Sequence, residues 1–241
     1  MEIYIQSAGT SPDFDYCWQP EVPSLLTRIS SYIQGESSSL VLARFENQFI
    51  LLVTGLASSN KKDFAGRVIR HSVAWVCEEN NDNEKQLRAI AVQALQGVLS
   101  SKIDRLIQFG GKSGFKFEIS EFEKLNQSIL DEETIDNMPL ESSETRPKMA
   151  KNSQELRDSL AGDLQRSCLP KDYEILVVVT GIKSEDSLIQ TKIWRSLSNL
   201  VKSDNWKDIP KKELQQPNFK MAVLAIVAVL AIAIIILIVL H

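Results

Sequence analysis

The sequence predicts an α/β or α+β domain with a mixed β-sheet, an early β-hairpin and flanking helices, followed by one C-terminal transmembrane helix. Short β-branched runs alternate with segments whose apolar residues recur at helical spacing, which is typical of a sheet covered by helices. Two of these runs, residues 40–45 and 48–54, are separated only by Glu46 and Asn47, which favours a hairpin. The final run, residues 221–240, is entirely apolar.

The first half of the chain provides four predicted strands and two predicted helices. Alternating or β-branched runs indicate strands, and apolar residues spaced three or four apart indicate helices. The strands are residues 2–7, 40–45, 48–54 and 67–77, and the helices are residues 24–34 and 84–99.

The second half is less regular. We expect a short strand at 115–119, a helix from Ser120 to about residue 130, a helix at 153–168, a central apolar strand at 173–180 and a helix at 184–202. Residues 131–151 are acidic, contain prolines and have no apolar pattern, so they are interpreted as a mobile loop or linker.

The domain organisation follows from the apolar end. A helix of twenty residues is about 30 Å long, the thickness of a bilayer's hydrocarbon core. Five lysines precede the run and only His241 follows it, so the positive-inside rule places the preceding domain in the cytoplasm. The expected arrangement is a cytoplasmic domain at 1–202, a juxtamembrane linker at 203–219 and a transmembrane helix at 220–240. The chain is thus expected to be a tail-anchored, single-pass membrane protein that contacts the lipid bilayer.

Composition limits the expected partners. With 27 basic and 31 acidic residues and a net charge of −4, the chain has no basic bias toward a nucleic acid duplex. Cys17, Cys77 and Cys168 are too scattered for a zinc site, so no metal is expected. The sequence contains no Walker A, GxGxxG, GxSxG or HExxH motif, so no cofactor is expected. Alanines recur every third residue in the apolar run, which leaves open a homo-oligomer formed through the tail.

The densest polar segment is the candidate site. Residues 61–71 place Asp63, Arg67, Arg70 and His71 around a turn between two predicted strands. Arginine side chains at such a junction can bind a phosphate or carboxylate, and Asp63 can orient a guanidinium group. The alternative is a solvated turn whose charges bind nothing.

Several motifs carry a resemblance. YIQS near the start, Tyr16 with Trp18, and then LVLAR, LLVTGL and DFAGRVIRHSVAW together span about residues 3–76. In these motifs the chain resembles an uncharacterised bacterial family of small cytoplasmic domains, some with membrane tails, to which no activity is attached. The turn at residues 9–11 also resembles the first turn of CRISPR-associated Rossmann nucleotide sensors, although a hairpin follows it here.

Three functions remain open. The first is a noncatalytic binding or adaptor module for a protein partner or small ligand at the bilayer. The second is a membrane-associated defence-type sensor or effector, triggered by an anionic nucleotide at Arg67 and Arg70. The third is a thiol hydrolase that uses Cys17 or Cys77.

Overall fold

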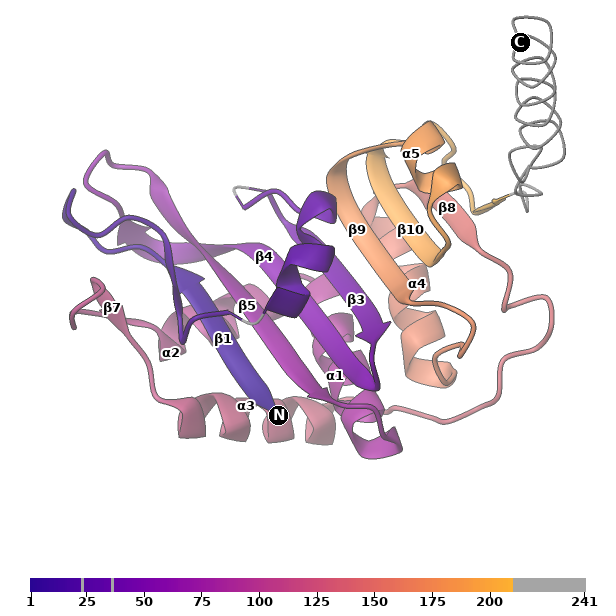
Figure 1. The fold of residues 1–241 in the computed structure, drawn as a ribbon, viewed down its shortest axis with the longest axis horizontal. Helices are drawn as coiled ribbons and strands as arrows, with labels where there is room; N and C mark the ends of the chain where they lie inside the picture. The colour runs from indigo at the N-terminus through magenta and orange to yellow at the C-terminus, as the bar shows by residue number, and fades with distance from the viewer. Residues whose placement is uncertain (23, 36, 210–241) are drawn as a thin grey trace, which may run out of the picture. The chain divides into compact units, whose positions relative to one another are not determined.

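The computed structural model describes residues 1–22, 24–35 and 37–209, which belong to one unit, Met1–Ile209 (Figure 1). Among the helices of these residues, none combines the length and the apolar character that a bilayer-spanning segment needs. The predicted transmembrane helix at 220–240 lies outside the described residues, and so does most of the predicted linker.

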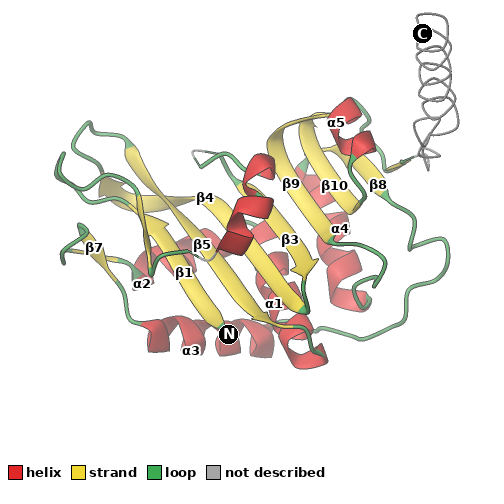
Figure 2. Ribbon diagram, in the orientation of Figure 1, coloured by secondary structure: helices red, strands yellow, loops and turns green. Residues whose placement is uncertain are grey.

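A nine-stranded mixed sheet forms the centre of the unit, with the strand order β11-β8-β10-β9-β3-β4-β5-β1-β2 (Figure 2). Its strands are β1 (Glu2–Ser7), β2 (Cys17–Gln19), β3 (Ser39–Phe45), β4 (Gln48–Lys62), β5 (Val68–Glu78), β8 (Lys148–Lys151), β9 (Ile175–Ser184), β10 (Ile193–Leu200) and β11 (Lys207–Asp208). Strands β8, β10 and β9 are parallel, whereas β3, β4, β5, β1 and β2 pair antiparallel. The predicted mixed α+β fold with flanking helices is therefore confirmed.

The predicted early hairpin is also confirmed. Strand β3 pairs with β4 from Ser39↔Thr54 to Phe45↔Gln48, and Glu46 and Asn47 form the connection. Both connecting residues have positive φ, 51° and 65°, as in the turns that match the twist of a two-residue hairpin.

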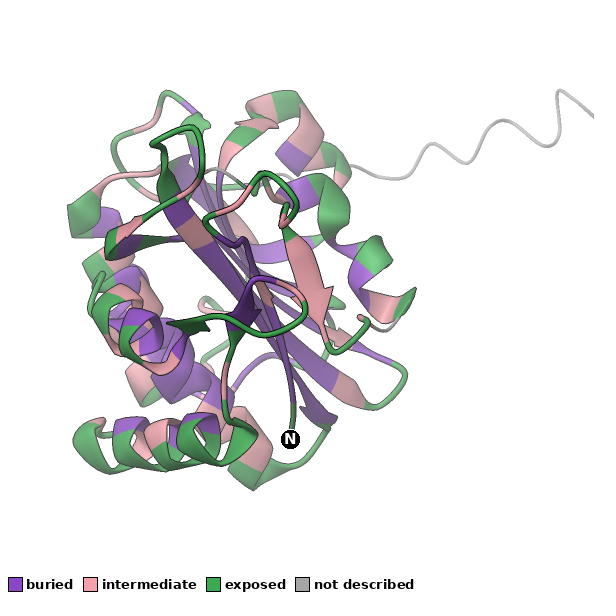
Figure 3. Cartoon of the chain, turned by 90° about the vertical axis from the view of Figure 1, so that its left-hand side faces the viewer, coloured by how far each residue is buried: buried purple, intermediate pink, exposed green. Residues whose placement is uncertain are grey.

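Helices cover both faces of the sheet. One face carries α1 (Asn81–Leu95), α2 (Leu99–Leu106), α3 (Ile119–Glu132) and α4 (Gln154–Arg166), which pack on side chains such as Trp75 and Leu51. The other face carries the 3-10 helices η1 (Ser24–Arg28) and η2 (Ser30–Tyr32) and the short helix α5 (Glu185–Gln190). Buried residues accordingly gather in the sheet and on the inner sides of the helices (Figure 3). A small hairpin of β6 (Gln108–Phe109) and β7 (Phe115–Lys116) lies outside the main sheet.

The predicted helix at 184–202 is wrong over most of its length. Only Glu185–Gln190 is helical, and Ile193–Leu200 forms β10 between β8 and β9. A strand with both faces covered is apolar on both sides, so its apolar residues also match a helical spacing. Here Trp194 and Leu197 face one core and Ile193 faces the other. These residues form a strand because they pair with two parallel neighbours, β8 and β9.

The acidic segment 131–151 is more ordered than expected. Its last four residues form β8, and its first two complete α3. In between, the buried Arg88 of α1 donates to the Asp136 carbonyl at 2.6 Å and to Asn137 Oδ1 at 3.1 Å. The buried guanidinium satisfies backbone acceptors that an isolated acidic segment leaves to water.

The sheet also continues beyond the predicted domain end at Lys202. Strand β11 pairs antiparallel with β8, and the Ile209 N–H donates to the Pro147 carbonyl at 2.8 Å. Ile209 is buried in the core of the second face. The described unit therefore ends at Ile209.

Candidate functional site

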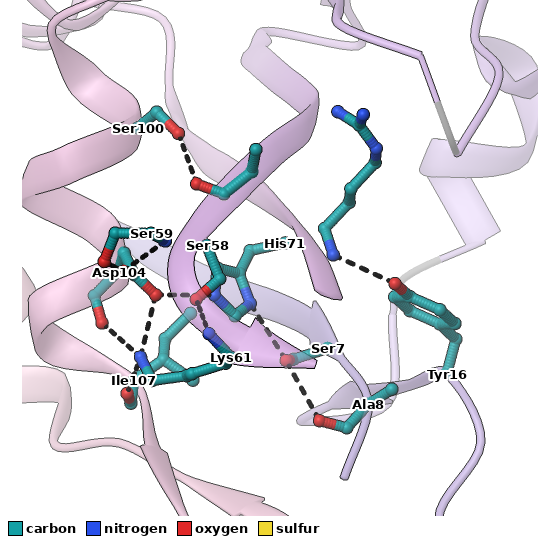
Figure 4. A network of polar contacts seen from close by, with 12 residues as sticks. Ser7, Ala8, Tyr16, Ser58, Ser59, Lys61, His71, Ser100, Asp104 and Ile107 are labelled. Atoms are coloured by element: carbon teal, nitrogen blue, oxygen red, sulfur yellow. Dashed lines mark hydrogen bonds and ion pairs between the residues drawn. The ribbon is translucent and has the colours of Figure 1, made fainter. Parts of the chain in front are cut away.

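A buried polar network centred on Asp104 of α2 lies beside the long strands β4 and β5 (Figure 4). Lys61 Nζ donates to Asp104 Oδ1 at 2.8 Å, to the Asp104 carbonyl at 2.6 Å and to the Ile107 carbonyl at 2.7 Å. Ser59 donates to Asp104 Oδ2 through its N–H at 2.9 Å and its hydroxyl at 2.6 Å. All three ammonium hydrogens thus have an acceptor, and the last carbonyls of α2 gain a cation.

The network continues to the end of β1. His71 Nε2 lies 3.3 Å from Asp104 Oδ1, and His71 Nδ1 lies 2.9 Å from the Ser7 hydroxyl. Because the carboxylate accepts the Nε2 proton, Nδ1 is the nitrogen that accepts from Ser7. Serine, histidine and aspartate therefore form one hydrogen-bonded chain.

Burial and hydrogen bonding set the charges in this chain. Burial lowers the pKa of His71, which keeps the imidazole neutral. Burial alone raises the pKa of Asp104, but hydrogen bonds from Lys61, Ser59 and Ser58 outweigh it and hold that pKa well below its usual range. The network thus contains one carboxylate, one ammonium and a neutral imidazole.

The network has a clear structural role. Strand β3 begins at Ser39, opposite Thr54, so among the described residues no strand pairs with the rest of β4 on that side. Helix α2 covers this edge, where Asp104 accepts from the Ser59 N–H and the Ser100 hydroxyl donates to the Ala57 carbonyl at 2.9 Å. A helix that covers an exposed strand edge prevents pairing with other chains. The Ser7 hydroxyl belongs to a side chain that is only 1% exposed, so the serine–histidine–aspartate chain acts as an internal clamp.

The four residues of the predicted site divide into separate environments. Asp63 and Arg67 meet at the tip of the β4–β5 hairpin, where Arg67 Nε donates to Asp63 Oδ2 at 2.8 Å. Arg70 and His71 are consecutive in β5, so their side chains point to opposite faces. His71 enters the Asp104 network, whereas Arg70 Nη1 donates to the Gly55 carbonyl at 3.3 Å.

The aspartate at the tip organises the turn. Asp63 Oδ1 accepts from the N–H groups of Ala65 and Arg67, both at 2.9 Å, and Gly66 adopts a φ of +78°. Burial alone raises the pKa of Asp63, but the hydrogen bonds from Arg67 and Ala65 together outweigh it and lower this pKa overall. The turn leaves Phe64 60% exposed and Val68 42% exposed.

Sequence reasoning missed Asp104, Ser7 and Ser59. They lie 33, 64 and 12 residues from His71 in the sequence. No local spacing connects them with one another or with Lys61. The one available signal was the aspartate on the apolar stripe of a short helix, since a buried carboxylate needs partners.

The three cysteines are free thiols that differ in burial. Cys77 is buried, and burial raises the pKa of its thiol to about 12. Cys17 lies opposite Ser7 in the β1–β2 ladder. A thiol nucleophile needs a nearby base, but both ring nitrogens of His71 are already hydrogen-bonded, to Ser7 and to Asp104. Within residues 1–22, 24–35 and 37–209, no group of three His, Cys, Asp or Glu side chains is placed to hold a metal ion.

The geometry defines a mixed α+β domain with a buried polar network and an exposed, internally hydrogen-bonded hairpin tip. Comparison of the chain with protein-family models, with curated proteins and with solved structures finds no match.

Proposed function

We propose that the chain is a tail-anchored, single-pass membrane protein whose cytoplasmic domain is a noncatalytic module that binds a protein partner. The observation that carries the binding role is the β4–β5 tip, which presents Phe64 to solvent with 60% of its surface exposed. The membrane tether is supported by the apolar run at 221–240 and by the lysines that precede it.

The chemistry of the tip suits a protein partner. Phe64 and Val68 provide apolar surface, and Lys62 and Arg67 flank them with cationic side chains. Aromatic and arginine residues contribute most of the binding energy at protein interfaces, with charged residues at the rim. We expect the partner to offer an apolar pocket with an acidic rim.

The tip is held together by hydrogen bonds within the turn. Asp63 holds three donors of the turn, as described above, and the Asp63 N–H donates to the Arg67 carbonyl at 2.9 Å. At the base of the hairpin, Lys61 is bound to Asp104. Because an ordered loop loses little conformational entropy on binding, this preorganisation favours affinity.

A noncatalytic role is supported by the state of the nucleophilic side chains. Ser7 is bound to His71 but is only 1% exposed. The Cys77 thiol has its pKa raised to about 12, whereas reactive cysteines have lowered values.

The membrane tether is tested by fractionation. In bacterial cells, the full chain should remain in the membrane pellet after alkaline carbonate washing, and a variant lacking residues 220–240 should not. Equal extraction of both chains would disprove the tether.

The partner surface is tested by photo-crosslinking in cells. A benzoylphenylalanine at Phe64 should yield a defined adduct with a second protein, and Lys62→Glu should weaken it. Phe109, which is 40% exposed on the β6–β7 hairpin, is the matched control position. The same adducts from positions 64 and 109 would refute a specific surface at the β4–β5 tip.

A further inference from the structure

Strand β5 extends beyond the strand that pairs with it on its outer side. On that side, β1 pairs with β5 only as far as Gln6↔Ser72, whereas β5 begins at Val68. On the inner side, β4 pairs with β5 as far as Lys62↔Val68. Among the described residues, the segment Val68–Arg70 therefore has a neighbouring strand on one side only.

The backbone groups of Val68 point toward this open side. In an antiparallel ladder, pairs that exchange hydrogen bonds with each other alternate with pairs that do not. The Asp63 N–H donates to the Arg67 carbonyl at 2.9 Å, so the adjacent pair Lys62↔Val68 is of the second kind. The N–H and the carbonyl of Val68 therefore point away from β4.

Tyr16 takes the place of a strand two residues further along β5. The Arg70 N–H, which also points outward, donates to the Tyr16 hydroxyl at 2.9 Å (Figure 4). Tyr16 is 39% exposed. Among the described residues, no comparable partner is found for the N–H and carbonyl of Val68 or for the carbonyl of Arg70. The edge thus keeps both donors and acceptors for an incoming strand.

The two edges of the β4–β5 hairpin differ in their protection. Helix α2 covers the β4 edge, where Asp104 accepts from the Ser59 N–H and Ser100 donates to the Ala57 carbonyl. The β5 edge has the single hydroxyl of Tyr16. An open strand edge is a template for pairing with another chain, and several peptide-binding domains use such an edge to bind an extended segment.

The side chains along this edge indicate the chemistry of the incoming strand. Val68 and Arg70 lie on one face of β5, and Val68 is 42% exposed. No carboxylate of the described residues forms an ion pair with Arg70. Because side chains directly opposite on neighbouring strands contact each other, an apolar residue fits opposite Val68 and an acidic residue opposite Arg70. A second copy of this edge fits less well, since it brings like charges together.

We propose that the outer edge of β5 at Val68–Arg70 pairs with an extended segment of the partner protein that carries an acidic and an apolar side chain two residues apart. The segment adds an antiparallel strand to β5, bonds to the backbone of Val68 and replaces Tyr16 as the acceptor of the Arg70 N–H. This inference rests on the proposed function, because it describes how the partner is held beside Phe64.

The probe is the peptide acetyl-Thr-Thr-Glu-Thr-Val-Thr-Thr-amide, titrated into the full chain in a neutral detergent and followed by nuclear magnetic resonance. Antiparallel pairing places its glutamate opposite Arg70 and its valine opposite Val68. The amide signals of Val68 and Arg70 should shift saturably, and the peptide with lysine in place of glutamate should bind more weakly. Absence of saturable shifts at these residues, or equal binding of the two peptides, would overturn the proposal.

Val68→Pro and Val68→Ala separate the backbone from the side chain. Both variants lose the valine side chain, but only proline lacks the N–H, and proline is tolerated where a strand edge faces solvent. Val68→Pro should bind the peptide about fivefold or more weakly than Val68→Ala, which corresponds to the loss of one hydrogen bond. Equal affinities of the two variants would overturn the proposal.

Tyr16→Phe provides a test that does not alter β5. It removes the hydroxyl that competes for the Arg70 N–H and keeps the ring. This variant should bind the peptide at least as tightly as the parent, and weaker binding would overturn the proposal. A dimer of the parent that Val68→Pro dissociates would show that a second copy occupies the edge, which would also overturn it.

The photo-crosslink at position 64 distinguishes this inference from the proposed function. If the adduct at position 64 forms but the peptide does not bind, the strand pairing is rejected and the partner surface stands. If the peptide binds at Val68 but no adduct forms, the strand pairing stands and the partner surface at Phe64 is rejected.

Discussion

Lys61 Nζ lies 2.8 Å from Asp104 Oδ1, and this ion pair joins the outer part of β4 to the carboxyl end of α2. Both side chains are mostly shielded from solvent, with 15% and 7% of their surfaces exposed. The pair therefore closes the strand edge that β3 leaves open, and it sets the position of the hairpin above it.

Asp104→Ala should lower the free energy of unfolding by about 3–5 kcal/mol, since it removes the carboxylate that pairs with the ammonium of Lys61 and leaves the N–H and hydroxyl of Ser59 without their acceptor. Urea unfolding followed by tryptophan fluorescence measures the change. The exposed Asp131→Ala in α3 is the control and should change stability by less than about 0.5 kcal/mol. Similar effects of the two substitutions would contradict the role given to the Asp104 network.

His71 should make stability depend on pH below about 6.5. Burial lowers its native pKa from 6.5, so unfolded His71 takes up a proton at pH values where native His71 does not. Stability therefore falls as the pH falls from 6.5 toward the native pKa, by up to about 1.4 kcal/mol per pH unit.

This pH dependence is measured as the difference in urea midpoint between pH 7.5 and pH 5.5. His71→Gln should be less stable than the parent at pH 7.5 but should lose most of the midpoint difference. A variant with the parent's full pH dependence would show that His71 is not the group responsible.

Arg88→Met should release the acidic segment from the core. The buried Arg88 guanidinium donates to the carbonyls of Leu164 and Asp136 at 2.7 and 2.6 Å, so its loss leaves these acceptors unsatisfied and should cost about 2–4 kcal/mol. Hydrogen exchange should become faster at Asp136 and Met138, whose N–H groups bond the end of α4. Lys85→Met in the same helix is the control, and unchanged exchange in Arg88→Met would refute the anchoring role.

Gly55 and Gly66 allow backbone strain to be separated from close packing. Both have positive φ, +71° and +78°, but a Cβ at Gly55 would lie 2.4 Å from the Ser37 carbonyl carbon, whereas a Cβ at Gly66 would meet nothing within 4 Å. Gly66→Ala should destabilise by about 1 kcal/mol from strain alone, and Gly55→Ala by clearly more. Thermal melting ranks the two, and an equal or reversed order would refute the close approach.

Cys77 should be the least reactive thiol of the native protein. With a pKa of about 12, only about one thiol in ten thousand is ionised at pH 8, and the side chain is buried. Cys17 and Cys168 are only partly buried. Iodoacetamide labelling followed by mass spectrometry should modify Cys77 only after unfolding, and rapid native labelling at Cys77 would contradict its burial.

The sequence predicted those parts of the fold that depend on neighbouring residues. The β3–β4 hairpin follows from two apolar runs joined by Glu46 and Asn47, and α1 follows from a regular apolar stripe. The central position of β9 follows from its continuous apolar run. The transmembrane tail stays a prediction from the sequence.

The predictions that proved wrong concern segments whose contacts are with residues far away in the sequence. Residues 193–200 match a helical spacing, yet they form β10 because β8 and β9 provide parallel partners on both sides. The acidic segment has no apolar pattern, yet Arg88 and Arg195 bind its carbonyl groups from the core.

The sequence by itself determined which segments are apolar enough to form strands and helices, because that information lies in spacings of two to four residues. Only the tertiary structure decided that His71 meets Ser7 and Asp104. Side chains that lie tens of residues apart come together through sheet order and helix docking, which no local spacing encodes.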